Sequence, residues 1–524
     1  MNPMNAMNDR SDMTARPDMT ETPDTRGKKE MNTMNPARRG LRGVLAASAV
    51  AVLLGLGLAA PAAAAPLVDP NATGSITVHK LQAPDSPTGL PNNGTVVDTT
   101  GLLPLPGVEF QVRQVTGVDL ATNDGWADAA GLSGVFDAAD PEGSITGAGF
   151  ALAAGSSLVT DGAGQAAFTG LPVGLYLVEE TSVPAGVTPS APFLVSVPLT
   201  DPDDRDAWLY DVHVYPKNAV TTATKTVADD AAVQLGDEVM FTITSDIPNV
   251  DPIDGFRIVD VLDPKLDYVA GAVSLADGTS ITEGPDYTIT HDAATNAVTV
   301  EFTAAGRAVL AANNTTQVVV DLVAAVNAVG EIANQALIYP NAASFDIDPG
   351  EPGGPTVTPE VETRWGGLTL EKVGATGTPL TGAVFQVFTS ADDAAAQTNP
   401  VTLGGDTEFE VVAADGTLTI EGLRYSDFAN GVTVAPGDAG YLQYYLVEVQ
   451  APDGYELLAE PIEFTVTAAT SAAGIDLTIT NVPHNGGFQL PFTGGTGSGL
   501  LYLVGIGLIA GGVVFLVVKR RRNA

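Results

Sequence analysis

The same succession of three strand-like motifs occurs twice in this sequence. In each copy, a strand ending in lysine comes first, a strand containing Phe-Gln-Val second, and a strand containing Leu-Val-Glu, followed by Pro-x-Gly, third. The matching segments are residues 75–80 and 367–372, 106–112 and 381–387, and 176–180 and 444–448. Alternation of apolar and polar residues between turn residues is typical of half-buried strands. The repeat therefore predicts two related β-domains.

The region between the two copies has the same alternation, at residues 239–244, 256–261, 297–302 and 318–323. A stretch rich in Pro and Gly, residues 348–359, predicts an extended linker. The length of 524 residues gives room for several domains of roughly 100–200 residues each. We therefore predict an all-β protein with three tandem immunoglobulin-like β-sandwich domains, covering residues 65–217, 218–350 and 351–486.

The first 64 residues are organised like a secretory leader. The basic segment 38–42 precedes the apolar run 44–60, and a site rich in small residues follows. This order is typical of a signal peptide, and we place cleavage after Ala64. Residues 1–64 are thus a predicted leader and signal peptide. A membrane anchor is the alternative, and a later start of translation, at an internal Met, stays open.

Three elements follow one another at the C-terminus. The first is a pentapeptide, Leu490, Pro491, Phe492, Thr493 and Gly494. The second is the uncharged apolar run 500–518, which is about long enough for a helix that spans a bilayer. The basic residues 519–522 come last and should stay cytoplasmic. Residues 487–524 therefore predict a terminal signal with a transmembrane helix at 500–518.

The composition argues against several classes of function. The chain has 23 basic and 62 acidic residues and a formal net charge of −39, which argues against nucleic acid as a partner. It has no cysteine, and its four histidines show no spacing typical of metal ligands; His79 and His213 read as ordinary strand residues. Neither a phosphate-binding loop nor a nucleophile elbow is present. We expect no cofactor, no metal and no enzyme active site, with weak calcium binding by the acidic loop 201–206 left open.

The order of pentapeptide, apolar run and basic tail at the C-terminus resembles a sortase sorting signal. The resemblance implies that the thiolate of a membrane sortase attacks the carbonyl carbon of Thr493 and releases the chain from Gly494 onward. An amine then resolves the thioester.

Residues 65–493 contain only five lysines, which are Lys80, Lys217, Lys225, Lys265 and Lys372. Lys217 ends a run that resembles the W-x-x-x-V-x-V-Y-P-K pilin motif of SpaA-type shaft pilins of Gram-positive bacteria. The matching residues are Trp208, Val212, Val214, Tyr215, Pro216 and Lys217. The resemblance implies that the amine of Lys217 is joined to Thr493 of a neighbouring subunit by an isopeptide bond.

Two further lysines resemble the internal cross-linking lysines of the same family. In the third, CnaB-like domain, the resemblance implies a bond between Lys372 and Asn481, with Glu448 of an E-box-like segment polarising the amide. In the middle, CnaA-like domain, the implied residues are Lys225, Asn334 and Asp260, and the alternatives are Asn341 and Asp263. Whether Lys80, Glu180 and Asn218 form a bond in the first domain stays open. Lys265 is expected to have no role.

The combined resemblance implies a structural major subunit of a covalently polymerised surface fimbria, from an actinobacterial relative. The implied partners are a pilin-type class C sortase, a housekeeping sortase with peptidoglycan, further copies of the chain head to tail, and minor tip or base pilins. The expected location is the cell wall, with a precursor in the plasma membrane, and the expected role is to support adhesion. The alternative is a monomeric, wall-anchored adhesin in which the β-domains serve as a stalk.

Overall fold

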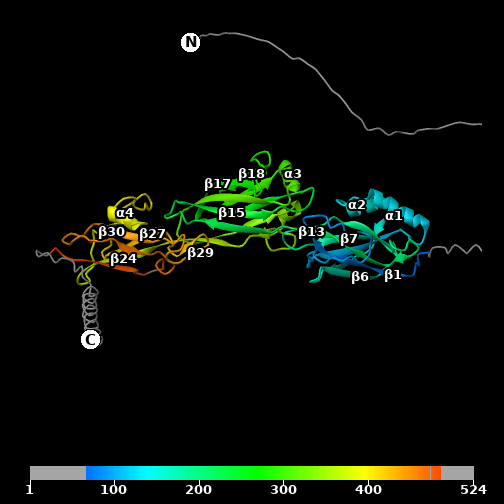
Figure 1. Ribbon diagram of the computed structural model, residues 1–524, viewed down its shortest axis with the longest axis horizontal. Helices are drawn as coiled ribbons and strands as arrows, with labels where there is room; N and C mark the ends of the chain where they lie inside the picture. Colours follow the sequence, from blue (N-terminus) through cyan, green and yellow to red (C-terminus); the bar gives the residue numbers. More distant parts are fainter. Residues whose placement is uncertain (1–66, 473, 485–524) are drawn as a thin grey trace, which may run out of the picture. The chain divides into compact units, whose positions relative to one another are not determined.

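A computed structural model describes residues 67–472 and 474–484 (Figure 1). In this part the chain is mostly β-strand, and the strands form three successive β-domains, each with a large hydrophobic cluster. The prediction of an all-β chain of tandem immunoglobulin-like domains is confirmed. None of the helices within residues 67–484 is long and apolar enough to cross a membrane. The predicted signal peptide, the sorting pentapeptide and the apolar run 500–518 lie outside the described residues.

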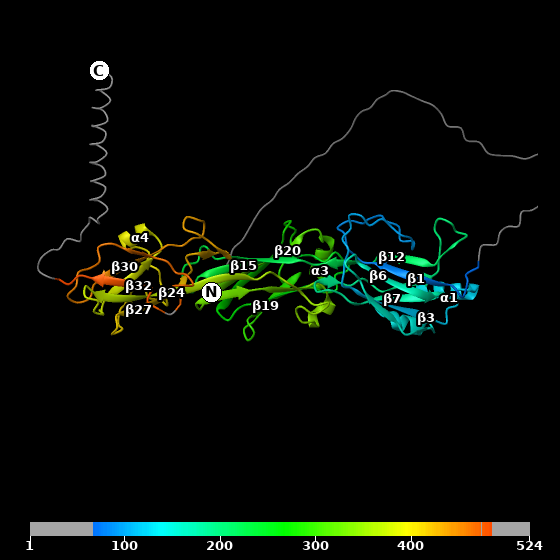
Figure 2. The ribbon, with the colours of Figure 1, turned by 90° about the horizontal axis from the view of Figure 1, so that it is seen from below.

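The first domain begins with β1 and is closed by the pilin-motif strand β12, which pairs with β1 in parallel. These two strands and β6 form one sheet in the order β12-β1-β6, and all three are labelled in Figure 2. The second large sheet has the order β4-β3-β7-β9, with β5 also paired to β3. The strands are β1 Thr73–His79, β2 Leu81–Gln82, β3 Glu109–Thr116, β4 Ala151–Leu152, β5 Ser156–Val159, β6 Gln165–Pro172, β7 Gly174–Ser182, β8 Val187–Thr188, β9 Phe193–Val197, β10 Leu199–Thr200, β11 Trp208–Leu209, β12 Asp211–Val214 and β13 Lys217–Val220.

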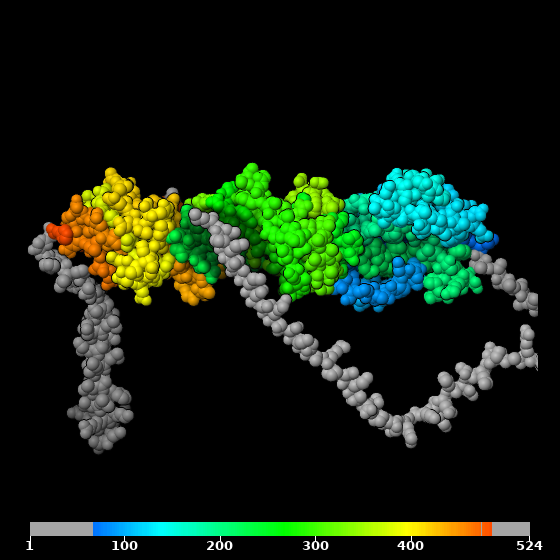
Figure 3. All heavy atoms as spheres, turned by 90° about the horizontal axis from the view of Figure 1, so that it is seen from above, coloured from blue at the N-terminus to red at the C-terminus, as the bar shows by residue number. Residues whose placement is uncertain are grey.

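Two helices, α1 Asn123–Val135 and α2 Pro141–Gly147, are inserted between β3 and β4 and were not expected from the sequence. The side chains of Thr122 and Asp140 cap them by accepting the N–H groups of Gly125 and Gly143, as is usual for these residue types. The helices cover a small separate core on the outer side of β3 and β7. In Figure 3 they form the cyan surface of this domain.

The middle domain packs two antiparallel sheets, in the orders β14-β15-β20-β17 and β18-β19-β16-β22-β23. Its core contains Phe241, Phe256 and Phe302, all fully buried. The Pro- and Gly-rich stretch 348–359 is not simply an extended linker, because its strand β23 pairs with β22. The elements are β14 Ala223–Ala228, β15 Glu238–Asp246, β16 Arg257–Val261, β17 Leu266–Leu275, β18 Tyr287–Asp292, β19 Ala297–Phe302, α3 Ala304–Ala312, β20 Gln317–Val326, β21 Gly330–Asn334, β22 Ala336–Tyr339, the 3-10 helix η1 Ala342–Asp346 and β23 Thr356–Val357.

The third domain is entered by a strand that serves two domains. The first half of β24 pairs with β21 of the middle domain, and its second half pairs with β27 and β32. The facing sheet has the order β26-β25-β30-β31. The elements are β24 Val361–Gly374, β25 Val384–Phe388, α4 Ala391–Ala396, β26 Phe409–Glu410, β27 Thr417–Arg424, β28 Phe428–Ala429, β29 Val432–Thr433, β30 Tyr444–Gln450, β31 Ile462–Phe464 and β32 Leu477–Asn481.

Candidate functional site

In the third domain, the first and last strands bring Lys372 and Asn481 together. β24 and β32 are parallel neighbours, with Lys372 opposite Ile479 and Gly374 opposite Asn481. The Nζ of Lys372 donates to Oδ1 of Asn481 at 2.6 Å and to the carbonyl oxygen of Ile479 at 3.1 Å. Both side chains are buried. The amine therefore lies in contact with the carboxamide that it would have to attack.

Glu448 of β30 completes this site from the facing sheet. Both of its carboxylate oxygens accept hydrogen bonds from Nδ2 of Asn481 at 2.9 Å, and Oε1 lies 3.9 Å from Nζ of Lys372. Burial lowers the pKa of Lys372 to about 8, although the charge of Glu448 opposes this shift. A lowered pKa favours the neutral, nucleophilic form of the amine.

In the middle domain, Lys225 of β14 meets Asp260 of β16. Their Nζ and Oδ2 atoms lie 2.5 Å apart, and both side chains are buried. Burial lowers the pKa of Lys225 and raises the pKa of Asp260, while the mutual attraction of the two charges opposes both shifts. Both directions favour a neutral amine beside a protonated acid. Asp263, the alternative acid, instead caps a turn by accepting the N–H of Lys265.

Asn334 and Asn341 differ in how their amides are paired. Asn334 ends β21 and is buried, yet neither polar atom of its side chain makes a standard hydrogen bond within the described residues; it is close enough to Asp260 to lower the pKa of that acid. Asn341 caps η1, since its Oδ1 accepts the N–H of Ser344, and its Nδ2 donates to Thr188. Leaving the buried amide of Asn334 without hydrogen bonds costs folding free energy, whereas both polar atoms of the Asn341 side chain already have hydrogen-bond partners. This difference favours Asn334 as the partner of Lys225.

The first domain contains a third group of the same kind. Nζ of Lys80 lies 2.5 Å from Oε1 of Glu180 and 2.5 Å from Oδ1 of Asn218, and Nδ2 of Asn218 donates to Glu180 at 2.7 Å. Burial lowers the pKa of Lys80 to about 8; Glu180 opposes this shift and the charge of Lys217 adds to it. As in the third domain, the lysine contacts the asparagine and the asparagine donates to the glutamate. Here the lysine also donates directly to the glutamate, and Ser190 is an additional donor to Glu180.

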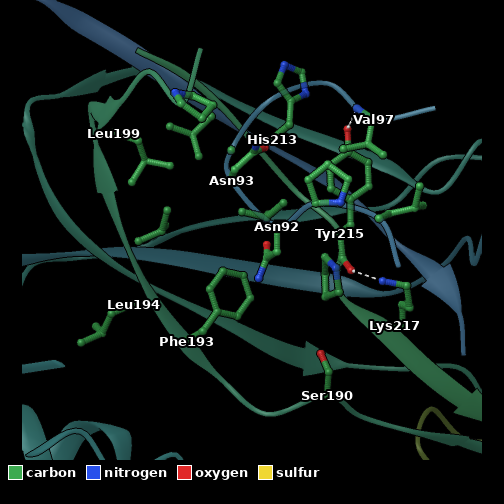
Figure 4. A pocket seen from close by; sticks show the side chains of 18 of the residues that line it. Asn92, Asn93, Val97, Ser190, Phe193, Leu194, Leu199, His213, Tyr215 and Lys217 are labelled. Atoms are coloured by element: carbon green, nitrogen blue, oxygen red, sulfur yellow. Dashed lines mark hydrogen bonds between the residues drawn. The ribbon is translucent and has the colours of Figure 1, made fainter. Parts of the chain in front are cut away.

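Lys217 immediately precedes Asn218 and is the first residue of β13. It forms part of the lining of a groove of about 820 Å³. Its Nζ donates to the carbonyl oxygen of Tyr215 at 3.3 Å (Figure 4). The groove is lined by the motif residues 212–217, by residues 90–94 and Val97 of the loop between β2 and β3, and by residues 193–195 of β9. Apolar side chains such as Leu90, Phe193 and Leu199 share this lining with polar ones, among them Asn92, Asn93, Ser190, Thr200 and His213.

Each residue of the pilin motif has a separate structural task. Val212 and Val214 are buried in the core beneath β12. Trp208 stacks on Trp126 of α1, with ring centroids 5.5 Å apart. The hydroxyl of Tyr215 accepts the N–H of Val97 at 2.8 Å, and the carbonyl oxygen of Pro216 accepts the N–H of Leu81. The motif therefore fixes the strand and one groove wall and leaves Lys217 at its end.

Three residues near this groove, Trp126, His79 and His213, were not expected from the sequence to have a role there. Trp126 lines it from the unexpected helix α1. His79 and His213, read as ordinary strand residues, contact each other through Nε2 and Nδ1 at 2.9 Å. A period of two along each strand places both on the polar side, but only the parallel pairing of β1 with β12 brings them together. Within the described residues, no group of three or more His, Asp or Glu could hold a metal ion.

Known protein families match the chain in three successive segments. Residues 71–219 match the N-terminal D1 domain of Gram-positive pilin subunits, residues 220–340 match the Sgo0707 N2 domain, and residues 366–482 match a prealbumin-like fold domain. The fimbrial subunit type 1 of Actinomyces viscosus is 35% identical, with 94% of this chain and 99% of that protein covered.

Two solved structures of Corynebacterium diphtheriae pilins are also similar. The full-length major pilin SpaD is 30% identical with a TM-score of 0.63, and 80% of this chain and 99% of that one are covered. The major pilin SpaA is 26% identical with a TM-score of 0.57, and 78% and 100% are covered. Together with the three domains and their buried lysines, these similarities show that the chain belongs to the SpaA-type major pilins of Gram-positive, actinobacterial bacteria, the structural subunits of fimbriae.

Proposed function

We propose that Lys217 and Thr493 are the two ends of the bond that joins successive subunits. The neutral amine of Lys217 attacks the carbonyl carbon of the thioester formed at Thr493 of a second copy. The C–N bond forms, the C–S bond breaks, and the proton lost by the amine is taken up by the departing thiolate. The observation that carries the proposal is the position of Lys217 in the lining of a groove, one wall of which is built by its own motif.

The groove suits the segment that would have to lie in it. The residues before Thr493 are Leu490, Pro491 and Phe492, which are apolar and need an apolar surface. Side chains such as Phe193, Leu199 and Val214 line the groove. Its volume of about 820 Å³ is in the range of pockets that hold a ligand of this size. We propose that the groove receives this segment of the neighbouring copy.

The proposed partners follow from this reaction. A pilin-type class C sortase supplies the thioester, and a housekeeping sortase transfers the finished polymer to peptidoglycan. Minor pilins occupy the tip or base, and no cofactor is required. The chain is then secreted, held briefly in the plasma membrane as a precursor, and finally displayed in a wall-anchored fimbria that supports adhesion. The domain boundaries 65–217, 218–350 and 351–486 remain predictions.

We also propose that internal isopeptide bonds join Lys372 to Asn481 and Lys225 to Asn334. In each, the neutral amine attacks the carboxamide carbon and forms the new C–N bond. The C–N bond to the amide nitrogen breaks, ammonia leaves with a proton supplied by Glu448 or Asp260, and that acid regains the proton lost by the attacking amine. Each internal reaction occurs once per chain, which is not enzymatic turnover. In the joining reaction the protein is the substrate of sortase and not the catalyst. The contact of 2.6 Å at Lys372 and the unpaired amide of Asn334 support this reading.

The test is an immunoblot of wall proteins released with muramidase and boiled in SDS. Cells with the wild-type chain should show a high-molecular-weight ladder, and cells with Lys217→Arg should show monomer only. Lys265→Arg is the matched control, because Lys265 lies in an exposed loop and, among residues 67–472 and 474–484, its amine donates only to the carbonyl oxygen of Glu331. It should leave the ladder unchanged. Monomer alone in all strains would instead favour the monomeric wall-anchored adhesin.

A further inference from the structure

The pilin-motif strand is joined to the first strand of its domain by a pair of histidines. Nε2 of His79, the last residue of β1, lies 2.9 Å from Nδ1 of His213 on β12, and the contact is partly buried. The ring of His79 also stacks on Tyr215, with centroids 4.7 Å apart and an interplanar angle of 12°. His213 occupies a variable position of the motif and His79 lies outside it, so the fixed motif residues do not account for the pair.

The same residues fasten the loop between β2 and β3, residues 83–108, over the groove. The backbone N–H of His213 donates to the carbonyl oxygen of Gly94 at 2.8 Å. The N–H of Val97 donates to the hydroxyl of Tyr215, the residue that stacks on His79, at 2.8 Å. Because Gly94 and Val97 both line the groove, the histidine pair and the groove wall are mechanically connected.

The contact between the two rings depends on their protonation. One nitrogen must accept while the other donates, so at least one ring must be neutral. Burial, and then the neighbouring His213, lowers the pKa of His79. On the β6 side, the residue opposite His79 is the uncharged Gln165. On β12, the carboxylate of Asp211 accepts a hydrogen bond from Ser75, and Tyr215 and Lys217 follow His213 along the chain. The covering loop carries Asp85 and Asp98, and within residues 67–484 no carboxylate forms an ion pair with either ring.

We propose that the His79–His213 pair is a proton-sensitive latch that holds the loop 83–108 over the groove at neutral pH and releases it when both rings are protonated. The release of the loop stands on the contacts above. Its consequence, slower joining of subunits in acid, rests on the proposed function of the groove. In mildly acidic solution, two imidazolium rings 2.9 Å apart would repel each other and lose their hydrogen bond.

The direction of the pH dependence follows from linkage. With a lowered pKa in the folded state, His79 binds fewer protons there than in the unfolded or opened state. The stabilising contribution is therefore complete above the ordinary histidine pKa of about 6.5 and is lost as the pH falls below it.

Hydrogen exchange of the full-length chain in detergent tests the latch without any sortase. Between about pH 7.5 and about pH 5, after correction for intrinsic rates, protection of the loop peptide should fall severalfold in the wild type, because both rings take up protons over this range and the contact between them is lost. His79→Phe keeps the stack on Tyr215 but cannot take up a proton, so its protection should not change with pH. His291→Gln, an exposed histidine on β18 paired with Asn296, should behave as the wild type.

Two results would overturn the latch: wild-type protection that is the same at both pH values, or an equal change in His79→Phe. His213→Gln, which keeps a hydrogen-bonding side chain that does not titrate, replaces His79→Phe if the latter melts early. The consequence is measured as the ratio of joined wild type to joined His79→Phe in a sortase reaction, which cancels the pH dependence of the sortase. The ratio should fall severalfold at the lower pH. An absence of joining at any pH would refute the proposed function and leave the exchange result to decide the latch.

Discussion

Glu448 is the residue on which the third-domain bond should depend most. Glu448→Gln removes the proton donor but keeps the shape of the side chain, so the chain should retain one ammonia per molecule that the wild type loses. Lys372 and Asn481 are 109 positions apart, and a covalent tie across about 100 residues is worth about 4–5 kcal/mol in the chain-entropy model. Intact mass and denaturant unfolding measure both effects. Glu463→Gln, an exposed residue of β31, is the control and should change neither.

The unlinked Glu448→Gln chain should also acquire a pH dependence that the linked chain lacks. Burial lowers the pKa of Lys372 from 10.5 to about 8, and the substitution removes the carboxylate that opposes this shift. The folded state then binds fewer protons than the unfolded state, so the free energy of unfolding should rise as the pH increases from about 8 toward 10.5. A linked Lys372 is an amide and does not titrate. Equal slopes in the two chains would argue that the wild type is unlinked as well.

The choice of asparagine in the middle domain can be decided by substitution. Asn334→Ala should abolish the bond to Lys225, so that the variant falls short of the mass calculated from its own sequence by one ammonia fewer than the wild type does. Asn341→Ala should leave the mass loss intact and cost about 1 kcal/mol through the lost cap of η1. Mass spectrometry of the two variants measures this difference. The reverse pattern would assign the bond to Asn341.

Among these residues, the sequence indicated what chemistry to look for but not every pairing. Lys372, Glu448 and Asn481 were identified from their motifs, and the structure brings them into contact. The sequence left the choice between Asn334 and Asn341 open, because one lies at the end of a strand and the other comes shortly after the next strand. Only the coordinates show that one amide is unpaired and the other caps a helix. The same holds for His79 and His213, which are joined by parallel pairing across 134 positions.

At the scale of elements, Arg424 of β27 supports the junction of the middle and third domains. Its guanidinium is buried and donates to the carbonyl oxygens of Ala232 in the middle domain at 2.9 Å and of Phe428 and Gly440 in the third. The N–H of Arg424 also donates to the carbonyl oxygen of Val233. A loop of the middle domain thereby pairs with the edge of a third-domain strand.

Arg424→Met should leave these carbonyl groups without partners, at a cost of about 1–3 kcal/mol for each buried group left unsatisfied. We expect faster hydrogen exchange in residues 229–237 and 422–430 and a lower melting temperature. Arg257→Met is the matched control. It removes a partly exposed ion pair with Glu301, worth about 0–1 kcal/mol, and a contact with the ring of Phe345, worth about 0.5–1 kcal/mol. If both variants melted alike, the junction would not depend on Arg424.

Strands could be predicted where apolar and polar residues alternate regularly. Elements whose formation depends on tertiary contacts were harder to predict. The strands around Lys372 and Phe385 follow their pattern. The helices α1 and α2 do not, because residues 123–147 are rich in Gly, Ala and Asp and show little helical periodicity. Their packing onto Leu175 and Leu177 of β7 stabilises them, as tertiary contacts commonly do for short helices. Likewise, nothing in the local sequence pattern of residues 361–374 predicts that β24 pairs with strands of two different domains.

For the whole molecule, the three lysine groups predict how many bonds the mature chain contains. Each group lies in a separate domain with its own main hydrophobic cluster, and distant, independent sites contribute additively. With the Lys80–Asn218 contact counted as a third bond beside the two proposed above, the intact wild-type chain should have lost three molecules of ammonia. Glu180→Gln, Asp260→Asn and Glu448→Gln should each restore one, and the triple variant all three, with roughly additive losses of stability. A wild-type loss of two, unchanged in Glu180→Gln, would mean that Lys80 and Asn218 stay unlinked despite their contact of 2.5 Å, and that the first domain is held only by its noncovalent packing.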